Sequence, residues 1–259
     1  MNILFIGDLI GRAGRKVVSA LLDSIKYEYG IDLVIANGEN SAGGFGINEK
    51  IYKELRNKGI DIITTGNHIW DKKETANQLD EMEYLIRPAN YPEGVPGAGF
   101  ITVTVGDMEI TVINLMGRVF MPLSDCPFRV FDEIYDKVSK TVVLVDFHAE
   151  ATSEKNAFGL YVDGRAAAVI GTHTHVQTND DRLLPKGTFY ISDVGMCGAL
   201  DSVIGMEKNA PINRFLTGIP SKFEVEKKGK MVFNAVVFYI DKDTKKVRDF
   251  KKIFKVIEG

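Results

Sequence analysis

The segment Asn2-Ile3-Leu4-Phe5-Ile6-Gly7-Asp8 decides the fold of this chain. Its apolar run has the length of a buried strand, and Gly7 and Asp8 then end it. Residues 12–29 follow with apolar side chains at helical spacing, and Gly30 is placed to end that helix. A buried strand followed directly by an amphipathic helix is typical of an α/β protein.

The same order of strand, polar cluster and helix occurs twice more before residue 83. We expect strands at 32–36 and 60–64 and helices at 48–58 and 72–82, with Asn48 as the cap of the first of these helices. Strands that alternate with helices pair in parallel through right-handed crossovers, so their carboxyl ends meet at one edge of the sheet. The polar residues expected at that edge are Asp8, Glu39, Asn40, Asn67 and His68.

The pattern changes after residue 84 and predicts a mixed sheet system. Residues 100–105 and 109–115 have the pattern of a hairpin. The other expected strands are 141–145, 166–170, 189–192, 223–227, 231–240 and 247–257, and the other expected helices are 128–138, 153–161 and 207–216. No repeat or linker interrupts the chain, so we expect residues 1–259 to form a single domain.

The four histidines all follow runs that read as strands; they are His68, His148, His173 and His175. Taken alone, the His173-Thr174-His175 spacing fits a plain polar loop as well as it fits a metal site. In an extended segment the two imidazoles would face opposite sides. In a tight loop, after a strand that ends at Gly171, both can turn toward one place. Histidines scattered for surface chemistry would not all follow strands, so the set favours metal binding.

The composition is that of an ordinary globular protein with a full core, since 45% of the 259 residues are hydrophobic and 26% are charged. The net charge of −3 argues against an extensive nucleic-acid surface, which needs clustered lysine and arginine. Cys126 and Cys197 lack the spacing of a disulfide framework and indicate reduced thiols in a cytoplasmic protein. No segment has the pattern of a signal peptide or a membrane span, so we expect no membrane partner.

The candidate ligands combine carboxylates, amides and imidazoles without a thiolate, which suits manganese, iron or zinc. These candidate ligands are too many for one metal ion and enough for two. A shared carboxylate would hold the two ions roughly 3.5–4 Å apart. Glu39 is the expected bridge, because a carboxylate has two oxygens to share. Such a pair suits in-line attack of a metal-bound hydroxide on phosphorus. His68 is then placed to protonate the leaving oxygen, since imidazole titrates near neutral pH.

Five short blocks carry a resemblance to the calcineurin-like metallophosphoesterases. The blocks are Gly7-Asp8, Gly38-Glu39-Asn40, Gly66-Asn67-His68, Phe147-His148 and Gly171-Thr172-His173-Thr174-His175. The first block of that superfamily is usually Asp-x-His, whereas Leu9 and Ile10 follow Asp8 here, and its second block is usually Gly-Asp. Both departures, and the chain length, resemble the YmdB-like branch of small bacterial phosphodiesterases, and the similarity covers essentially the whole chain.

That resemblance implies a ligand set for each of two metal ions. Glu39 would be shared, Asn40 would take the place of the missing first-block histidine, and His68 would be the acid. The first ion would be held by Asp8, Glu39, Asn40 and His175, and the second by Glu39, Asn67, His148 and His173.

The resemblance also implies a fold, metals, substrates and an assembly. The fold would be a four-layer α-β-β-α sandwich of two mixed sheets. The metals would be iron or manganese, with zinc or magnesium as alternatives. The substrates would be cyclic nucleotides, either 2′,3′-cyclic or 3′,5′-cyclic monophosphates, and the chain would form a homo-oligomer.

Two other functions stay open from the sequence. The same metal core serves phosphomonoesterases and nucleotidases, because the surrounding loops decide the substrate. A non-catalytic protein could use such a site to sense a nucleotide or to organise a partner surface. A pure binder, however, has no need of an acid such as His68, which favours the enzyme.

Some neighbouring residues leave alternatives open as well. Asp146 and Glu150 either orient a ligand imidazole or carry surface charge. Trp70 is expected to pack against the following helix rather than to stack a base. Thr172 is expected to satisfy only local backbone groups. Residues 43–46 are expected to form a turn rather than to wrap a phosphate.

Overall fold

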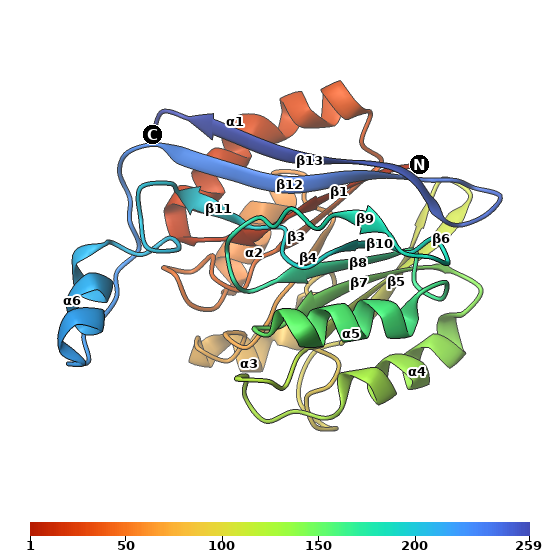
Figure 1. Cartoon of the computed structure of the whole chain (residues 1–259), viewed down its shortest axis with the longest axis horizontal. Coiled ribbons are helices and arrows are strands. Elements are labelled where there is room, and N and C mark those ends of the chain that lie inside the picture. Colours follow the sequence, from red (N-terminus) through yellow and green to blue (C-terminus); the bar gives the residue numbers. More distant parts are fainter.

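The computed structural model describes residues 1–259 and places them in two sheets flanked by helices (Figure 1). The first sheet has seven strands in the order β2-β11-β12-β1-β3-β4, with β13 also paired to β12. These strands are β1 (Asn2–Ile6), β2 (Asp8–Leu9), β3 (Leu33–Asn37), β4 (Ile62–Thr64), β11 (Met196–Ala199), β12 (Met231–Ile240) and β13 (Val247–Ile257).

The second sheet has six strands in the order β5-β6-β7-β8-β10-β9. These strands are β5 (Phe100–Val105), β6 (Met108–Met116), β7 (Val142–His148), β8 (Ala168–Thr172), β9 (Arg182–Leu183) and β10 (Phe189–Ile191). The β5–β6 pair is antiparallel, which confirms the predicted hairpin, while β6, β7, β8 and β10 are parallel neighbours. The sheet is therefore mixed, as expected.

The strands β1, β3 and β4 are parallel neighbours, which confirms the prediction from the alternation of strands and helices. The connections between them contain α1 (Gly11–Tyr29) and α2 (Glu49–Asn57). Gly30 follows α1 in the left-handed conformation, with φ of 56°, and ends the helix. The side chain of Asn48 caps α2 by accepting a hydrogen bond from the backbone N–H of Ile51.

Three apolar cores separate four layers of secondary structure. The first core, a cluster of 27 buried residues, includes side chains of α1, α2 and the first sheet. The second, with 21 residues, lies between the two sheets. The third, with 15, joins the second sheet to α4 (Pro127–Val138) and α5 (Thr152–Val162). In Figure 1, α1 and the pair α4 and α5 cover opposite outer faces, which confirms the α-β-β-α sandwich.

Strand β1 shows why its sequence is an unbroken apolar run. Leu4 and Ile6 belong to the core shared with α1, whereas Ile3 and Phe5 belong to the core between the sheets. Because both faces of the strand are buried, every position along it favours an apolar side chain. Complete burial of each such side chain contributes about 1.5–3 kcal/mol. Strand β1, which precedes the first polar cluster, is therefore held in place by apolar packing on both of its faces.

Strands β7 and β8 are longer at their carboxyl ends than the sequence predicts. The predicted strand 166–170 was expected to end at Gly171, but β8 continues through it to Thr172. A Cβ atom at position 171 would lie 1.9 Å from the carbonyl oxygen of Ser192, so glycine is needed for this close approach of two backbones. Strand β7 likewise continues to His148. Candidate ligands and their neighbours are therefore held by strand backbone.

Two expected elements are different in the structure. The strand predicted at 223–227 is absent, because Val225 makes only an isolated bridge to Met206. The helix predicted at 72–82 is divided into α3 (Lys73–Gln78) and the 3₁₀ helix η1 (Leu79–Glu81). The predicted helix at 207–216 is present as α6 (Asn209–Thr217), which stands away from both sheets in Figure 1. No helix of the structure combines the length and the apolarity needed to cross a bilayer.

Candidate metal centre

The polar residues predicted from five distant blocks meet where strands of both sheets end. Asp8 lies in β2, Glu39 and Asn40 follow β3, and Asn67 and His68 follow β4. From the second sheet, His148 is the last residue of β7, and the segment with His173 and His175 follows β8. The contacts given below join all of these residues into one cluster. The shared edge therefore brings the five blocks together.

His148 is at the centre of one half of this cluster. Its Nε2 atom lies 3.0 Å from Oε1 of Glu39, 3.1 Å from Oδ1 of Asn67 and 3.1 Å from Nδ1 of His173. The side chains of Glu39 and His148 are fully buried. Donor atoms of Glu39, His148 and His173 all lie within 4.8 Å of one another, close enough to share one cation.

The proton positions around His148 show that this half of the cluster suits a metal ion. The hydroxyl of Thr172 donates its hydrogen to Oδ1 of Asp146 at 2.7 Å, so it must accept from Nδ1 of His148, 2.9 Å away. In a neutral imidazole, Nε2 then presents a lone pair to the oxygens of Glu39 and Asn67. In a protonated imidazole, one Nε2 hydrogen serves only one of its three neighbours. A cation satisfies the lone pairs of Nε2 of His148 and of the Glu39 and Asn67 oxygens together.

The other half of the cluster is built around Asp8 and His175. Nδ1 of His175 donates to the carbonyl oxygen of Ile204 at 2.9 Å, which leaves a lone pair on Nε2 of the neutral ring. That Nε2 lies 3.8 Å from Oδ1 of Asp8. Oδ1 of Asp8 is buried and has no hydrogen-bond partner in the protein. An orphaned carboxylate oxygen facing an imidazole lone pair is costly unless a cation lies between them, so the residues fit a second ion.

Glu39 and Asn40 lie between the two halves. Oε1 of Glu39 faces His148, and it also accepts a hydrogen bond from Nδ2 of Asn40 at 3.2 Å. The same Nδ2 lies 3.1 Å from Nε2 of His175. Glu39 is thus placed where a bridging carboxylate is expected. Asn40 presents its amide nitrogen to these neighbours, so ligation by its oxygen requires a half-turn of the amide group.

The electrostatics of the cluster favour positive charge. Burial raises the pKa of Asp8 well above its usual range, and the nearby carboxylates of Asp193 and Glu39 raise it further. Burial would lower the pKa of His148, but the charges of Glu39 and Asp8 raise it to about 9. Burial likewise would raise the pKa of Glu39, but the charge and hydrogen bond of His148 bring it to about 2. The carboxylates thus hold a positive charge in the buried site, which a metal ion supplies more fully than a proton.

Asp146 supports the first half of the cluster from behind. It is fully buried, accepts hydrogen bonds from the hydroxyls of Thr64 and Thr172, and accepts one from Nδ2 of Asn37 at 3.0 Å. Its burial rules out surface charge, and its connection through Thr172 to His148 supports the interpretation that it orients a candidate ligand imidazole. The prediction that Thr172 satisfies only local backbone groups is wrong, because its hydroxyl connects His148 to Asp146.

A buried ion pair that the sequence did not reveal holds the histidine loop in place. Nζ of Lys155, in α5, lies 3.0 Å from Oδ2 of Asp193 and donates to the carbonyl oxygen of Thr172 at 2.8 Å. Oδ2 of Asp193 also accepts from the backbone N–H and the hydroxyl of Thr174. These contacts stabilise the unusual positive φ angles of His173 (100°) and His175 (67°), which cost of order 1–3 kcal/mol each. The loop can therefore turn both imidazoles inward.

His68 lies at the rim of the cluster. Its backbone N–H donates to Oε2 of Glu39 at 3.2 Å, and Nδ1 of its ring lies 2.8 Å from Oδ2 of Asp71. The edge of the ring also contacts Phe45, with centroids 5.1 Å apart. Its Nε2 atom makes no hydrogen bond within the protein. Asp71, which fixes the ring, was not singled out from the sequence, although its spacing of three residues from His68 is visible there.

A cavity of about 320 Å³ opens over this cluster. One part of its lining is polar and carries four of the candidate ligands, Glu39, Asn40, His173 and His175, together with His68 and Glu150. The other part of the lining, the apolar wall, consists of Phe45, Val203, Ile204, Met206, Pro211, Phe215 and Phe223. Glu150 is half exposed and lies 3.1 Å from Nε2 of His173, so it contacts a candidate ligand imidazole. Trp70 does not line the cavity; its ring packs against Tyr91, in a loop beyond the helix against which it was expected to pack.

Comparison with known proteins gives consistent similarities. The model of the family described as YmdB-like protein matches residues 4–253. A 2′,3′-cyclic-nucleotide 2′-phosphodiesterase of Bacillus subtilis (strain 168) is 50% identical over 255 residues, which are 98% of this chain and 96% of that protein. The crystal structure of a hypothetical protein from Thermus thermophilus has a TM-score of 0.93 at 44% identity and covers 99% of both chains.

A more distant similarity extends the fold comparison. The structure of a putative 5′-nucleotidase from Staphylococcus aureus has a TM-score of 0.62 at 14% identity. The match covers 98% of this chain and 54% of that one. At this identity the similarity concerns the fold alone.

Proposed function

The chain belongs to the YmdB-like protein family, and we propose that it is a dinuclear metal-dependent phosphodiesterase that hydrolyses cyclic nucleotides. The substrate class is supported by the Bacillus subtilis relative at 50% identity, whose name gives a 2′,3′-cyclic nucleotide as substrate. We extend the proposal to 3′,5′-cyclic monophosphates, which present the same diester group. The metals of the proposal are iron or manganese, with zinc or magnesium as alternatives, because carboxylate, amide and imidazole donors suit such ions.

The observation that carries the proposal is the convergence of carboxylate, amide and imidazole atoms with too few hydrogens among them, which leaves Oδ1 of Asp8 without any partner. Asp8, Glu39, Asn40 and His175 would hold one ion, and Glu39, Asn67, His148 and His173 would hold the other. When bound, the ions supply Lewis acidity, which neutralises charge on the phosphoryl oxygens and lowers the pKa of water. The chain fixes the ligands through buried bonds such as that from His148 to Thr172, so little rearrangement is needed on binding.

His68 is the residue that we assign to protonation of the leaving oxygen. Its Nδ1 is held by Asp71, which orients the ring, while Nε2 is free to meet a ligand. The side chain lines the cavity beside Glu39 but is not among the candidate metal ligands. A general acid must reach the departing ester oxygen within hydrogen-bond distance, and a side chain at the rim of the metal cluster can do so.

The apolar wall of the cavity suits the nucleoside part of the substrate. Phe45 and Phe223 offer aromatic faces, and Met206 offers an adaptable apolar surface. Binding energy from this wall would position the phosphate over the ligands without taking part in the reaction. A preference for cyclic nucleotides over small phosphate esters is therefore expected.

A substrate panel tests the proposed activity. Protein stripped with a chelator and reloaded with manganese or ferrous iron is assayed on 2′,3′-cyclic AMP, 3′,5′-cyclic AMP and adenosine 3′-monophosphate. We expect turnover of the cyclic diesters only after reloading, at rates above that of the monoester. Faster hydrolysis of the monoester would identify a phosphomonoesterase, and no turnover with either metal would favour a sensor.

A further inference from the structure

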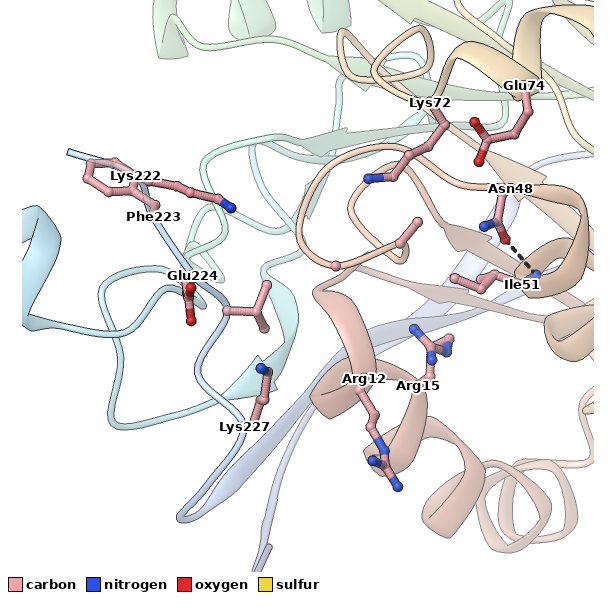
Figure 2. Close-up of a pocket in the computed structure, with 13 residues that line it drawn as sticks. Arg12, Arg15, Asn48, Ile51, Lys72, Glu74, Lys222, Phe223, Glu224 and Lys227 are labelled. Atoms are coloured by element: carbon pink, nitrogen blue, oxygen red, sulfur yellow. Dashed lines mark hydrogen bonds between the residues drawn. The ribbon is translucent and has the colours of Figure 1, made fainter. Parts of the chain in front are cut away.

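A second cavity, outside the metal cluster, is lined by basic side chains (Figure 2). It has a volume of about 630 Å³ and lies among the start of α1, the segment before α2, the start of α3 and residues 222–227. Five basic residues line it, Arg12, Arg15, Lys72, Lys222 and Lys227, against two acidic ones, Glu74 and Glu224. The lining therefore carries a surplus of three positive charges, five minus two, in a chain whose net charge is −3.

Most of these cations have no partner within the protein. Arg15 is bound to Glu54 and to the carbonyl oxygen of Ser41. The side chains of Arg12, Lys72, Lys222 and Lys227 make no hydrogen bond or ion pair. In Figure 2, the side chains of Lys72 and Lys222 extend toward each other from opposite sides of the cavity. Unpaired cations gathered around a cavity indicate a site for an anion.

The basic cavity shares a wall with the cavity over the metal cluster. Phe223 lines both cavities, while Gly43 faces the basic one and Gly44 faces the metal cluster. A Cβ atom at Gly46 would lie 2.9 Å from the side chain of Lys72 and 3.3 Å from the carbonyl oxygen of His68. The loop at 43–46 thus packs tightly on the segment that carries the proposed acid. A ligand bound at the metal cluster has a basic cavity as its direct neighbour.

We propose that this cavity is a second phosphate subsite, which binds the 5′-side phosphate of a short single-stranded RNA whose 2′,3′-cyclic end lies at the metal cluster. The inference rests on the proposed function and defines its substrate further. In such a strand, the nearest other anion is the internucleotide phosphate on the 5′ oxygen of the terminal nucleotide. Single-stranded nucleic acids are bound by basic grooves together with aromatic side chains. Here Phe223 is the aromatic residue placed between the two cavities.

The small size of the basic cavity agrees with the overall charge of the chain. A net charge of −3 argues against a long backbone footprint, which would need basic residues over a wide surface. Four unpaired cations around one cavity suffice for one or two phosphates. The subsite would therefore recognise the end of a strand and not its length.

The test compares two substrates that differ in this phosphate. They are 2′,3′-cyclic AMP and the dinucleotide ApA with a 2′,3′-cyclic phosphate at its 3′ end. We expect kcat/KM of the wild type to be about tenfold higher for the dinucleotide at low salt and to fall more steeply with salt. The variant R12A/K222A should lose this advantage while it retains turnover of the mononucleotide. Lys137→Ala, an exposed lysine on α4 in the opposite outer layer, is the matched control and should change neither.

Equal kcat/KM for both substrates in the wild type, or an equal loss for both in R12A/K222A, would overturn the subsite. Calorimetric titration with adenylyl-adenosine 3′-phosphate and with adenosine 3′-monophosphate tests it without turnover. The wild type should bind the dinucleotide about tenfold more tightly, and R12A/K222A should bind both alike. Equal affinities in the wild type would refute the subsite. Absence of all turnover would refute the proposed activity, while the titration would still decide the subsite.

Discussion

The two walls of the cavity over the metal cluster are built in different ways. The polar wall rests on the carboxyl ends of strands, and its side chains are fixed by buried bonds such as those of Asp146. Apart from Phe45, the apolar wall comes from residues 203–223, where α6 stands away from the sheets (Figure 1). On α6, Phe215 is 86% exposed and Leu216 is 80% exposed. The fold thus fixes the ligands rigidly and leaves the substrate side open to adjustment.

This difference separates the residues proposed to bind the metals from the residues proposed to select the substrate. Ligands must keep their geometry within a few tenths of an ångström, and strand ends between two buried cores provide that. A wall that contacts a nucleoside can tolerate change, because apolar contacts are not directional. Substitutions on the polar wall are therefore expected to have larger effects than those on the apolar wall.

Substitution of the proposed acid, His68→Ala, should have the largest effect among the next four substitutions. Turnover of cyclic nucleotides is expected to fall about 10²–10⁴-fold, the usual contribution of a general acid. Metal content should stay the same, because His68 is not among the candidate ligands. Activity and elemental analysis of the same preparations measure both. Loss of metal together with activity would instead make His68 a ligand or a support of one.

Asp71→Asn supplies a graded comparison for His68. It removes the carboxylate that orients the ring but leaves the imidazole itself. The loss of turnover should be smaller than in His68→Ala. An equal loss of turnover in Asp71→Asn and His68→Ala would mean that the imidazole of His68 has no role in proton transfer independent of Asp71.

Removal of the Thr172 hydroxyl should have an intermediate effect. Thr172→Val keeps the shape of the side chain and breaks the connection between His148 and Asp146. Loss of a partner that orients a ligand imidazole typically lowers metal affinity about 10–100-fold. Metal titrations followed by activity would show the shift. Thr111→Val, which removes a buried hydroxyl bonded to Thr102 and Thr141 in the same sheet, is the matched control. Unchanged metal affinity in Thr172→Val would show that the connection has no part in metal binding.

Change on the apolar wall should have the smallest effect. Phe215→Ala removes a mostly exposed side chain, so the free energy of unfolding should change by no more than about 0.5 kcal/mol. KM for cyclic nucleotides should rise by less than about fivefold with kcat unchanged, since the residue contributes binding but no chemistry. Steady-state kinetics test this. A fall in kcat above tenfold would place α6 within the catalytic machinery and abolish the distinction between the two walls.

Sequence alone predicted the strand framework well because most strands are buried on both faces. Such strands, like β1, appear as continuous apolar runs that end at polar residues. The prediction failed at 223–227, where Phe223 and Val225 alternate with polar residues as in a strand. There Val225 packs against Ile10 and Met206 in a small separate cluster, so its apolar character reflects side-chain packing and not a ladder of hydrogen bonds.

The candidate ligands were predictable because each one lies at or after the end of an apolar run that predicts a strand, and parallel strands end together. The residues that hold these ligands in place were not predictable from the sequence. Lys155 lies on a helix, where a lysine normally indicates a solvated face, yet it is buried against Asp193. The hydroxyl of Thr172 finds Asp146 only because β7 and β8 are neighbours in register. Such pairings depend on how the elements pack together, which no local pattern in the sequence reveals.

The most direct test of the two-metal account is the metal content of the wild type and of Glu39→Gln. Both proteins are loaded with manganese, freed of excess metal and analysed for ions per chain. The account predicts two ions per chain in the wild type. It predicts one or none in Glu39→Gln, because the shared carboxylate charge is lost, with activity reduced by more than about a hundredfold. One ion or none in the wild type, or two ions in both proteins, would contradict the assignment of Glu39 as the bridge of a dinuclear centre.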